Sequence, residues 1–405
     1  MSTYEVYKPN VLYVRTGLWP GGVNYADLNL LDTMQQNGFK VRILTGALSD
    51  ELRYENNNKY RIPIEINSSL DKLNRKEWSG DKRVREISDA IEICSKKHKS
   101  GVIFVGQPFY NFPEFNEAVV SSSRGHDTVL RIHDPVDDES SLRKVSQRTK
   151  GAVTTGIIAG IIKDSNPTMD VSVIPPGLDF SDFESERDAR RKIRQRHEIG
   201  GKDIVILQPT RVASQKRIDR AVNLAHNLQD RLSGERAVYL LVTGGNEPIQ
   251  TAIDEKRRLE KISRKLGFSN LIFLNGVPAF GGDFRLTDYY NSADLVTFMS
   301  ETEGFGLPPA ESSLVGIPCV TTRYTDSRSH SVFDEVYGGF EFIMEEDRTG
   351  EGVSSEVIDQ VVEAIEKPES WKEKKERNRR LVEKYSLDSI KDTLMDLLSK
   401  FNRNI

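Results

Sequence analysis

The chain has 405 residues and a formal net charge of −4, with 57 lysines and arginines against 61 acidic residues. This length fits two domains better than one core, and the acidic balance argues against nucleic acid as the main partner. The two cysteines, Cys94 and Cys319, lie in apolar stretches and predict reduced core thiols. Because the sequence shows no signal peptide and no long apolar run, we expect a soluble cytoplasmic protein.

The first half of the chain alternates short apolar strands with helical patterns. Residues 11–15 predict a strand, and the loop that follows contains Gly21 and Gly22. Apolar residues then recur at helical spacing as far as Gly38, a typical C-terminal cap. Further buried strands are predicted at 41–45, 101–105 and 128–132. Strands separated by helices indicate a parallel sheet covered on both faces.

A boundary is predicted at residues 171–179, where two consecutive prolines and a glycine end a strand. The same alternation then restarts, with a helical pattern at 218–228. The strands of this second half are predicted at 204–208, 237–242, 270–274 and 295–299. The last apolar stripe at helical spacing runs from Leu387 to Phe401. We therefore expect two doubly wound units, which bind ligands outside the carboxyl ends of their strands.

The most informative segment is residues 300–311, Ser-Glu-Thr-Glu-Gly-Phe-Gly-Leu-Pro-Pro-Ala-Glu, which follows the strand 295–299. Its glycines let the backbone approach a ligand, and the free N–H groups of the helix begun by Pro308 favour a phosphate. Glu303 and Glu311 flank this turn, and carboxylates accept hydrogen bonds from sugar or ribose hydroxyls. The segment therefore predicts a pocket for a nucleotide sugar.

Together with residues 316–320, this segment resembles the signature of the retaining glycosyltransferase family 4, usually written EGFGLP..EAMA.G.PVV. Here the helix reads Glu-Ser-Ser-Leu at 311–314, which keeps the glutamate and changes the packing face. The segment 323–330 replaces the glycine-rich loop that relatives often have, and either shapes the sugar pocket or covers the sheet edge. The boundary at 171–179 is similar to the family's VIPNGVD motif, which marks the passage between its domains.

The resemblance implies an α/β protein with the GT-B fold, in which two doubly wound Rossmann-like domains face a central cleft. Residues 1–177 would form the N-terminal, acceptor-side domain. Residues 178–385 would form the C-terminal domain that binds the nucleotide sugar. Residues 386–405 would form a helix that crosses back to the N-terminal domain.

The resemblance extends to residues 208–217, which are similar to the family's R..P.KG segment. It implies that Arg211 and Lys216 hold the donor diphosphate, since fixed cations stabilise the charge that develops on the leaving group. Arg217 stands where the family usually has glycine, which puts the local turn in question. Glu303 would contact hydroxyls of the transferred sugar, and Glu311 would bind the ribose.

Further donor contacts are implied by the resemblance alone. They are Gly21 and Gly22 near the diphosphate, Gly276 and Val277 at the base, and Gly304, Phe305, Gly306 and Leu307 at the sugar and phosphates. In the first domain, relatives place a histidine beside the donor sugar, which implies a catalytic role for His133 in orienting that sugar. The same position implies Asp134 as an acceptor contact.

A metal site is the alternative for the acidic residues after His133. Asp134, Asp137 and Asp138 offer hard oxygen ligands, although a solvated acidic loop is the other reading. Because Arg211 and Lys216 supply fixed positive charge, we expect no metal and no cofactor beyond the donor itself.

The implied activity is the metal-independent, retaining transfer of a hexose from a UDP- or GDP-sugar to a hydroxyl acceptor. No residue is an obvious nucleophile, so we expect same-face attack in which the leaving phosphate takes the acceptor's proton. The alternatives are a GT-B-type nucleotide-sugar epimerase or hydrolase, and a non-catalytic nucleotide-sugar sensor.

The acceptor, the sugar, the base and the oligomeric state stay open at this point. A sugar, a small polar molecule such as a glycerate-type solute, and a lipid-linked acceptor all fit. The basic stretch 72–99 would suit an anionic membrane surface, but its interspersed acidic residues favour a solvated helix.

Overall fold

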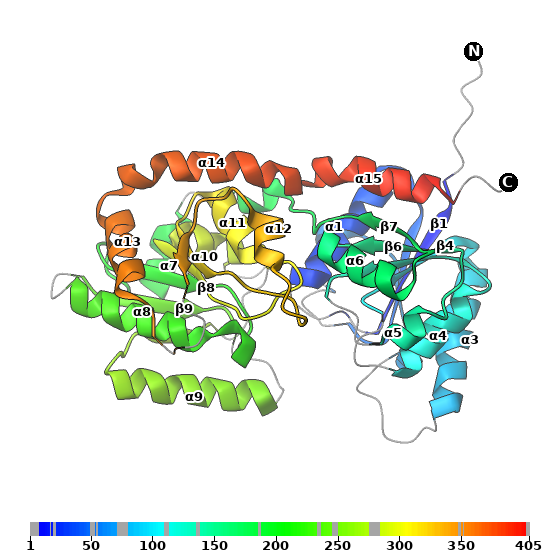
Figure 1. The fold of residues 1–405 in the computed structure, drawn as a ribbon, viewed down its shortest axis with the longest axis horizontal. Coiled ribbons are helices and arrows are strands. Elements are labelled where there is room, and N and C mark those ends of the chain that lie inside the picture. The colour runs from blue at the N-terminus through cyan, green and yellow to red at the C-terminus, as the bar shows by residue number, and fades with distance from the viewer. Residues whose placement is uncertain are drawn as a thin grey trace, which may run out of the picture. The chain divides into compact units, whose positions relative to one another are not determined.

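The computed structural model describes residues 8–16, 18, 22–48, 53, 56–70, 80–108, 113–134, 138–184, 188–232, 236–244, 250–274, 284–346, 350 and 352–401. The chain divides into two compact units (Figure 1). Unit 1 comprises Met1–Leu178 and Tyr385–Ile405, and unit 2 comprises Asp179–Lys384.

Within its described residues, unit 1 is built on a seven-stranded sheet in the order β3-β2-β1-β4-β5-β6-β7, with every neighbouring pair parallel. The strands are β1 (Asn10–Arg15), β2 (Val41–Thr45), β3 (Ile64–Ile66), β4 (Ser100–Gly106), β5 (Asp127–Ile132), β6 (Thr149–Val153) and β7 (Asp170–Val173). The central strands are near-continuous apolar runs because both faces of the sheet are buried. The strands expected at 11–15, 41–45, 101–105 and 128–132 are confirmed.

Helices cover both faces of this sheet, as expected of parallel strands joined by crossovers. They are α1 (Gly22–Gln36), α3 (Gly80–His98), α4 (Pro113–Ser123), α5 (Glu139–Leu142), α6 (Gly156–Ser165) and α15 (Leu387–Ser399), with short turns η1 (Asn56–Tyr60) and η2 (Ser68–Leu70). The basic stretch of the sequence lies largely in α3, whose Ile87, Ile91 and Cys94 are buried in the core.

The last helix, α15, lies beside α1 in unit 1 (Figure 1). Its stripe of Ile390, Leu394, Leu397 and Leu398 is buried. The chain leaves unit 1 after Leu178 and re-enters it at Tyr385. A backbone hydrogen bond joins these two points, since the Leu178 N–H donates to the Tyr385 carbonyl at 2.8 Å. These contacts make α15 part of the N-terminal unit.

Unit 2 contains, among its described residues, a six-stranded sheet in the order β10-β9-β8-β11-β12-β13, again parallel throughout. The strands are β8 (Ile204–Gln208), β9 (Val238–Val242), β10 (Leu271–Phe273), β11 (Leu295–Phe298), β12 (Cys319–Thr322) and β13 (Ile343–Glu345). All four strands expected in this half are confirmed.

The helices of unit 2 alternate with its strands. They are α7 (Ala189–Arg196), α8 (Ile218–Arg231), α9 (Gln250–Leu266), α10 (Leu286–Ser292), α11 (Leu307–Val315), α12 (Val332–Tyr337), α13 (Ser355–Glu366) and α14 (Lys372–Val382), with short turns η3 (Phe180–Phe183), η4 (Ser214–Lys216), η5 (Pro368–Trp371) and η6 (Glu383–Tyr385). Among the residues that the structure describes, no helix is both long and apolar enough to cross a membrane.

Each sheet reverses its strand order once, between β1 and β4 in unit 1 and between β8 and β11 in unit 2. This is the doubly wound arrangement, so the expected fold class of two Rossmann-like α/β units is confirmed. Ligands of such sheets bind where the order reverses, beyond the carboxyl ends of the two strands. In unit 2 these ends lead into residues 209–217 after β8 and residues 299–307 after β11.

Candidate active site

The loops after β8 and β11 are tied together at the point where the strand order of unit 2 reverses. The buried Gln208 side chain accepts a hydrogen bond from Thr297 Oγ1 at 2.7 Å and donates to Thr210 Oγ1 at 3.0 Å. Further out, the Glu301 N–H donates to the Gln215 carbonyl at 2.9 Å. These bonds place the two loops side by side.

Lys216 and Glu303 meet across these loops. Lys216 Nζ lies 2.5 Å from Glu303 Oε1, and each side chain is 11% exposed. Glu303 Oε2 has no hydrogen-bond donor among the described residues, so it can accept one from a ligand hydroxyl. Two residues expected at the site from sequence are thus in direct contact.

Arg211 lies in the same loop but does not join this pair. Its side chain is exposed, and it forms no hydrogen bond or ion pair within the described part of the chain. An arginine in this state retains its full capacity to bind an anion.

The hydroxyl groups of two tyrosines hold the glycine turn, residues 304–306, that precedes α11. Tyr324 Oη donates to the Phe305 carbonyl at 2.6 Å, and Tyr337 Oη donates to the Gly306 carbonyl at 2.5 Å. Gly306 has φ +80° and ψ +80°, and a Cβ on it would lie 2.5 Å from Tyr324 Oη. The turn therefore requires glycine here, for its backbone conformation and for the close approach of the tyrosine.

Three backbone N–H groups in and beside this turn are available to a ligand. The N–H groups of Gly304, Gly306 and Leu307 donate no hydrogen bond within the described residues. Prolines follow Leu307 in the first turn of α11 and have no backbone N–H group, so they add no further donors at the start of the helix. A cluster of N–H groups at a helix N-terminus is suited to a phosphate or another anion.

Glu311 lies one turn into α11 and is half-buried. Its Oε2 accepts a hydrogen bond from Tyr290 Oη at 2.5 Å. Burial raises the pKa of Glu311 to about 7, although the bond from Tyr290 acts in the opposite direction. The side chain is thus partly protonated near neutral pH, and a ligand hydroxyl that donates to it would favour the carboxylate.

Unit 1 contains a buried polar cluster centred on Asp27 of α1. Asp27 Oδ2 accepts from Tyr13 Oη at 2.5 Å and from Arg15 Nη1 at 2.7 Å, while Asp27 Oδ1 lies 2.7 Å from His133 Nε2 and 3.5 Å from Arg131 Nε. Burial alone would raise the pKa of Asp27, but the hydrogen bond from His133 and the charges of Arg15 and Arg131 outweigh it and hold that pKa well below the usual range. Asp27 is therefore an ionised carboxylate.

His133 is held by its backbone and by one ring nitrogen. Its N–H donates to Gln107 Oε1 at 2.9 Å, and its carbonyl accepts from Thr154 Oγ1 at 3.1 Å. Burial lowers its pKa, so the ring is neutral and Nε2–H donates to Asp27. This tautomer leaves Nδ1 as a hydrogen-bond acceptor. The adjacent Asp134 is half-buried, and its charge helps to raise the pKa of Arg15 against the effect of burial.

Several expected site residues lie outside the described residues, namely Gly21, Gly276, Val277 and Asp137. Gly22 is described as the first residue of α1. Of the expected acidic cluster, Asp138 caps α5 by accepting from Ser141 N and also accepts from Asn116 Nδ2. Its two oxygens are therefore used within the protein.

Another group of possible metal ligands occurs in unit 1, within the part that the structure describes. Glu65, Cys94 and His98 each offer one ligand atom, and these atoms lie within 4.8 Å of one another. Glu65 Oε2 also pairs with Lys97 Nζ at 2.9 Å, and burial raises the pKa of Cys94 to about 11. Because Lys97 pairs with the Glu65 carboxylate and the Cys94 thiol keeps its proton, we interpret this group as an ion-pair cluster at the end of α3.

Sequence reasoning missed the residues that hold the site residues in place. These are Tyr13 and Asp27 in unit 1 and Tyr290, Tyr324 and Tyr337 in unit 2. Asp27 did carry a signal, because it is a charged residue in a helical pattern whose neighbours at 26, 28 and 30 are apolar and buried.

Comparisons with known proteins show similarity to glycosyltransferases over part of the chain. Residues 189–385 match the protein family described as "Glycosyl transferases group 1". The chain is 31% identical over 172 residues to the D-inositol 3-phosphate glycosyltransferase of Xylanimonas cellulosilytica, covering 42% of this chain and 38% of that protein. It is 25% identical over 250 residues to the mannosylglucosylglycerate synthase of Thermotoga maritima, covering 56% of each. The chain thus spans less than two thirds of these relatives.

The similarity of structure extends further along the chain than the similarity of sequence. A glycosyltransferase from Rickettsia africae superimposes with a TM-score of 0.75 over 98% of this chain and 100% of its own, at 14% identity. A match at this low identity concerns the fold, which is GT-B. The similarity to the group 1 glycosyltransferase family thus concerns residues 189–385 of this protein, just under half of the chain.

Proposed function

We propose that this protein is a hexosyltransferase that moves a hexose from a nucleotide diphosphate sugar to a hydroxyl of an acceptor. The observation that carries the proposal is the contact between Lys216 and Glu303 beside the available N–H groups of the glycine turn. It combines a fixed cation, an oriented carboxylate and backbone donors where the strand order reverses. This combination suits a diphosphate bonded to a sugar.

Each group has a role in the proposed reaction. Lys216 and Arg211 neutralise the diphosphate, and the N–H groups of Gly304, Gly306 and Leu307 bind its oxygens or the sugar. Glu303 accepts from a sugar hydroxyl through its unoccupied oxygen, while Glu311 accepts from the ribose.

We further propose retention of configuration by same-face attack. The bond between the anomeric carbon and the phosphate oxygen breaks, and its electron pair leaves with the diphosphate. The acceptor oxygen bonds to the same face of that carbon, and its proton passes to the leaving phosphate oxygen. A double displacement needs a free carboxylate nucleophile. Glu303 is a poor candidate because Lys216 engages it at 2.5 Å.

The role of His133 in orienting the donor sugar and the role of Asp134 at the acceptor stay predictions. The Nδ1 acceptor of His133 fits a hydroxyl donor, which supports the first of them. Metal independence and a cytoplasmic location are likewise proposals. The relatives are named for an inositol phosphate and a glucosylglycerate, so polyhydroxy acceptors that carry an anionic group head the panel to be tested.

The test is the release of nucleoside diphosphate from UDP-, GDP- and ADP-sugars. Each donor is incubated alone and with pooled sugar, inositol phosphate, glycerate and lipid-linked acceptors, with and without EDTA, and Glu303→Ala serves as the blank. Acceptor-dependent release that EDTA does not affect supports the proposal, and the anomeric configuration of the product by NMR tests retention.

Other outcomes would select the alternatives. Donor consumption without an acceptor indicates a hydrolase or an epimerase, which product analysis separates. Tight donor binding without turnover indicates a sensor. Accumulation of a covalent glycosyl-enzyme in Glu303→Gln, seen by mass spectrometry, would refute same-face attack.

A further inference from the structure

Arg217 has a backbone conformation that favours glycine. Its φ and ψ are both 47°, in the left-handed region, at the junction between η4 and α8. A side chain with a Cβ is strained there, whereas glycine is not. The turn in question is thus formed with a glycine-like backbone by a residue with a long charged side chain, so compensating contacts are expected.

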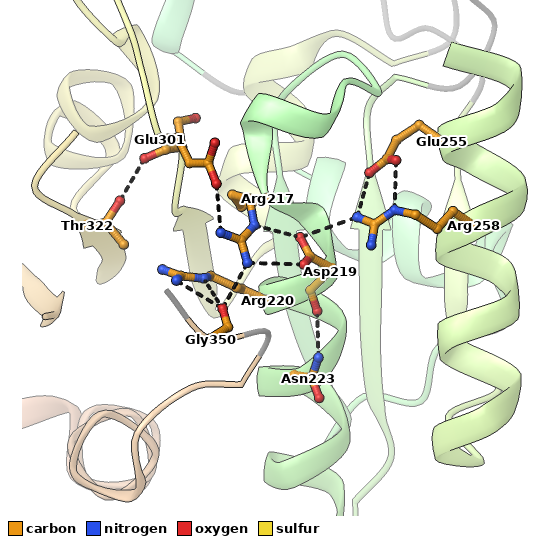
Figure 2. Close-up of polar contacts among 10 residues, drawn as sticks. Arg217, Asp219, Arg220, Asn223, Glu255, Arg258, Glu301, Thr322 and Gly350 are labelled. Atoms are coloured by element: carbon orange, nitrogen blue, oxygen red, sulfur yellow. Dashed lines mark hydrogen bonds and ion pairs between the residues drawn. The ribbon is translucent and has the colours of Figure 1, made fainter. Parts of the chain in front are cut away.

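The Arg217 side chain makes such contacts with three segments (Figure 2). Its Nε donates to Asp219 Oδ1 at 3.2 Å within α8, and its Nη1 donates to Glu301 Oε1 at 2.8 Å in the loop after β11. Its Nη2 donates to the Gly350 carbonyl at 2.8 Å. The Arg217 side chain is 12% exposed and Asp219 is buried, so the bond between them forms with little competing water, whereas the Glu301 side chain is 55% exposed.

Arg217 also extends a series of links between the two loops of the site. The Gln215 carbonyl accepts from the Glu301 N–H, Lys216 pairs with Glu303, and Arg217 pairs with Glu301. Three successive residues of one loop thus hold the other loop at residues 301 and 303. The link from Arg217 lies next to the pair that the proposed reaction uses.

We infer that Arg217 is a positioning residue that acts through Glu301 to keep Lys216 and Glu303 in contact. This inference rests on the proposed function, because the pair matters for turnover if Lys216 meets the diphosphate. The guanidinium fork holds Glu301, Asp219 and Gly350 in one geometry, which a flexible ammonium would not do. The contacts that Arg217 makes with the two loops offset the strain of its left-handed backbone.

Glycine is the informative substitution at this position. Arg217→Gly keeps the backbone conformation and removes the link, so it separates the side chain's role from that of the turn. Glu301→Gln removes the charge of the same link from the other loop, at a side chain that is 55% exposed. Arg258→Ala is the matched control, because Arg258 contacts Asp219 at 3.6 Å and Glu255 at 2.8 Å but not Glu301.

The experiment combines hydrogen exchange with kinetics on the full chain. In Arg217→Gly and in Glu301→Gln, we expect faster amide exchange in the peptide covering 300–306 and unchanged exchange in the strands of unit 2. We expect kcat/KM for the active donor to fall about tenfold in each, with most of the loss in kcat. The double variant should lose no more than either single variant, and Arg258→Ala should behave as the wild type.

Two different failures are distinguishable. Wild-type exchange at 300–306 in Arg217→Gly, or a double variant whose losses multiply, would overturn the positioning role while turnover by the wild type upholds the proposed function. A wild-type protein that turns over no donor would overturn the proposed function and the positioning role with it, and faster exchange in Arg217→Gly would then identify a structural link alone.

Discussion

Gly306→Ala tests whether the glycine turn before α11 depends on backbone conformation, on packing, or on both. At φ +80° a residue with a Cβ is strained by about 1–2 kcal/mol. The new Cβ would also lie 2.5 Å from Tyr324 Oη and 2.9 Å from Phe298 Cε1. These two rings are buried and packed edge to face, with centroids 5.6 Å apart, so neither has room to move.

Overpacking of this kind costs about 1–3 kcal/mol, and with the backbone strain the expected destabilisation is about 2–5 kcal/mol. Gly267→Ala is the matched control. Gly267 has φ +73° in the same unit, and a Cβ there would meet no atom within 4 Å. It should cost about 1–2 kcal/mol from strain alone. The difference between the two variants isolates the packing contribution.

The assay is urea unfolding of each variant. In addition, each variant is titrated with the nucleoside diphosphate that the active donor releases, to measure its binding. Tyr324→Phe removes the clashing hydroxyl and its bond to the Phe305 carbonyl, at a cost of about 1 kcal/mol. Combined with Gly306→Ala, it should recover part of the loss, so the double variant is more stable than the sum of the singles predicts. Equal losses in Gly306→Ala and Gly267→Ala, with additive behaviour of Tyr324→Phe, would refute the packing argument.

Three further predictions concern charge. The raised pKa of Glu311 means that the folded state keeps a proton that the unfolded chain releases above pH 4.5, so stability should fall as pH rises from about 4.5 to 7 and then level off. Glu311→Gln should remove that slope in unfolding measured across this range; the full shift corresponds to at most about 3 kcal/mol, and partial exposure reduces it. Asp27→Asn should destabilise the protein by about 3–5 kcal/mol at pH 7, because Arg15 and Arg131 lose a buried counter-charge. Since the pKa of Asp27 is depressed, that difference should shrink as the pH of the denaturation assay falls below about 4. Lys216→Met should lower kcat by about 100-fold or more, and adding Glu303→Gln should cost far less than its effect in the wild type, as a double-mutant cycle would show.

The sequence was sufficient for most of the strands because burial on both faces leaves a plain apolar signature. It did not indicate β3, β6, β12 or β13, and the first two of these show why. The first is an edge strand of three residues, Ile64–Ile66, too short to form a pattern. The second, Thr149–Val153, carries a lysine and a glycine, and its place in the sheet comes from pairing with β5 on one side and β7 on the other. Such pairing is tertiary information.

The same division applies to the candidate site. Lys216, Glu303 and Glu311 could be found because a short motif fixes residue types at short spacing. The hydroxyls of Tyr324 and Tyr337 reach carbonyls 19 and 31 residues away in the chain, and no local pattern reveals such bonds. The sequence also could not show whether the local turn forms with Arg217 at the position where the family usually has glycine. The cost of a side chain in the left-handed region depends on what that side chain contacts.

The two glutamates of the motif differ in what faces them, and this difference assigns their chemistry. Glu303 faces an ammonium, which occupies one of its oxygens and leaves the other for a neutral hydroxyl. Glu311 faces a tyrosine hydroxyl at a half-buried position, where its charge costs more than in water and is favoured when a ligand donates to it. One carboxylate is therefore fixed before any ligand binds, while the other gains its charge with the ligand. An enzyme that used either glutamate as a nucleophile would need it both charged and unengaged, and neither side chain meets both conditions. The arrangement thus supports the proposed same-face reaction, in which the leaving phosphate accepts the proton and the protein supplies orientation and positive charge.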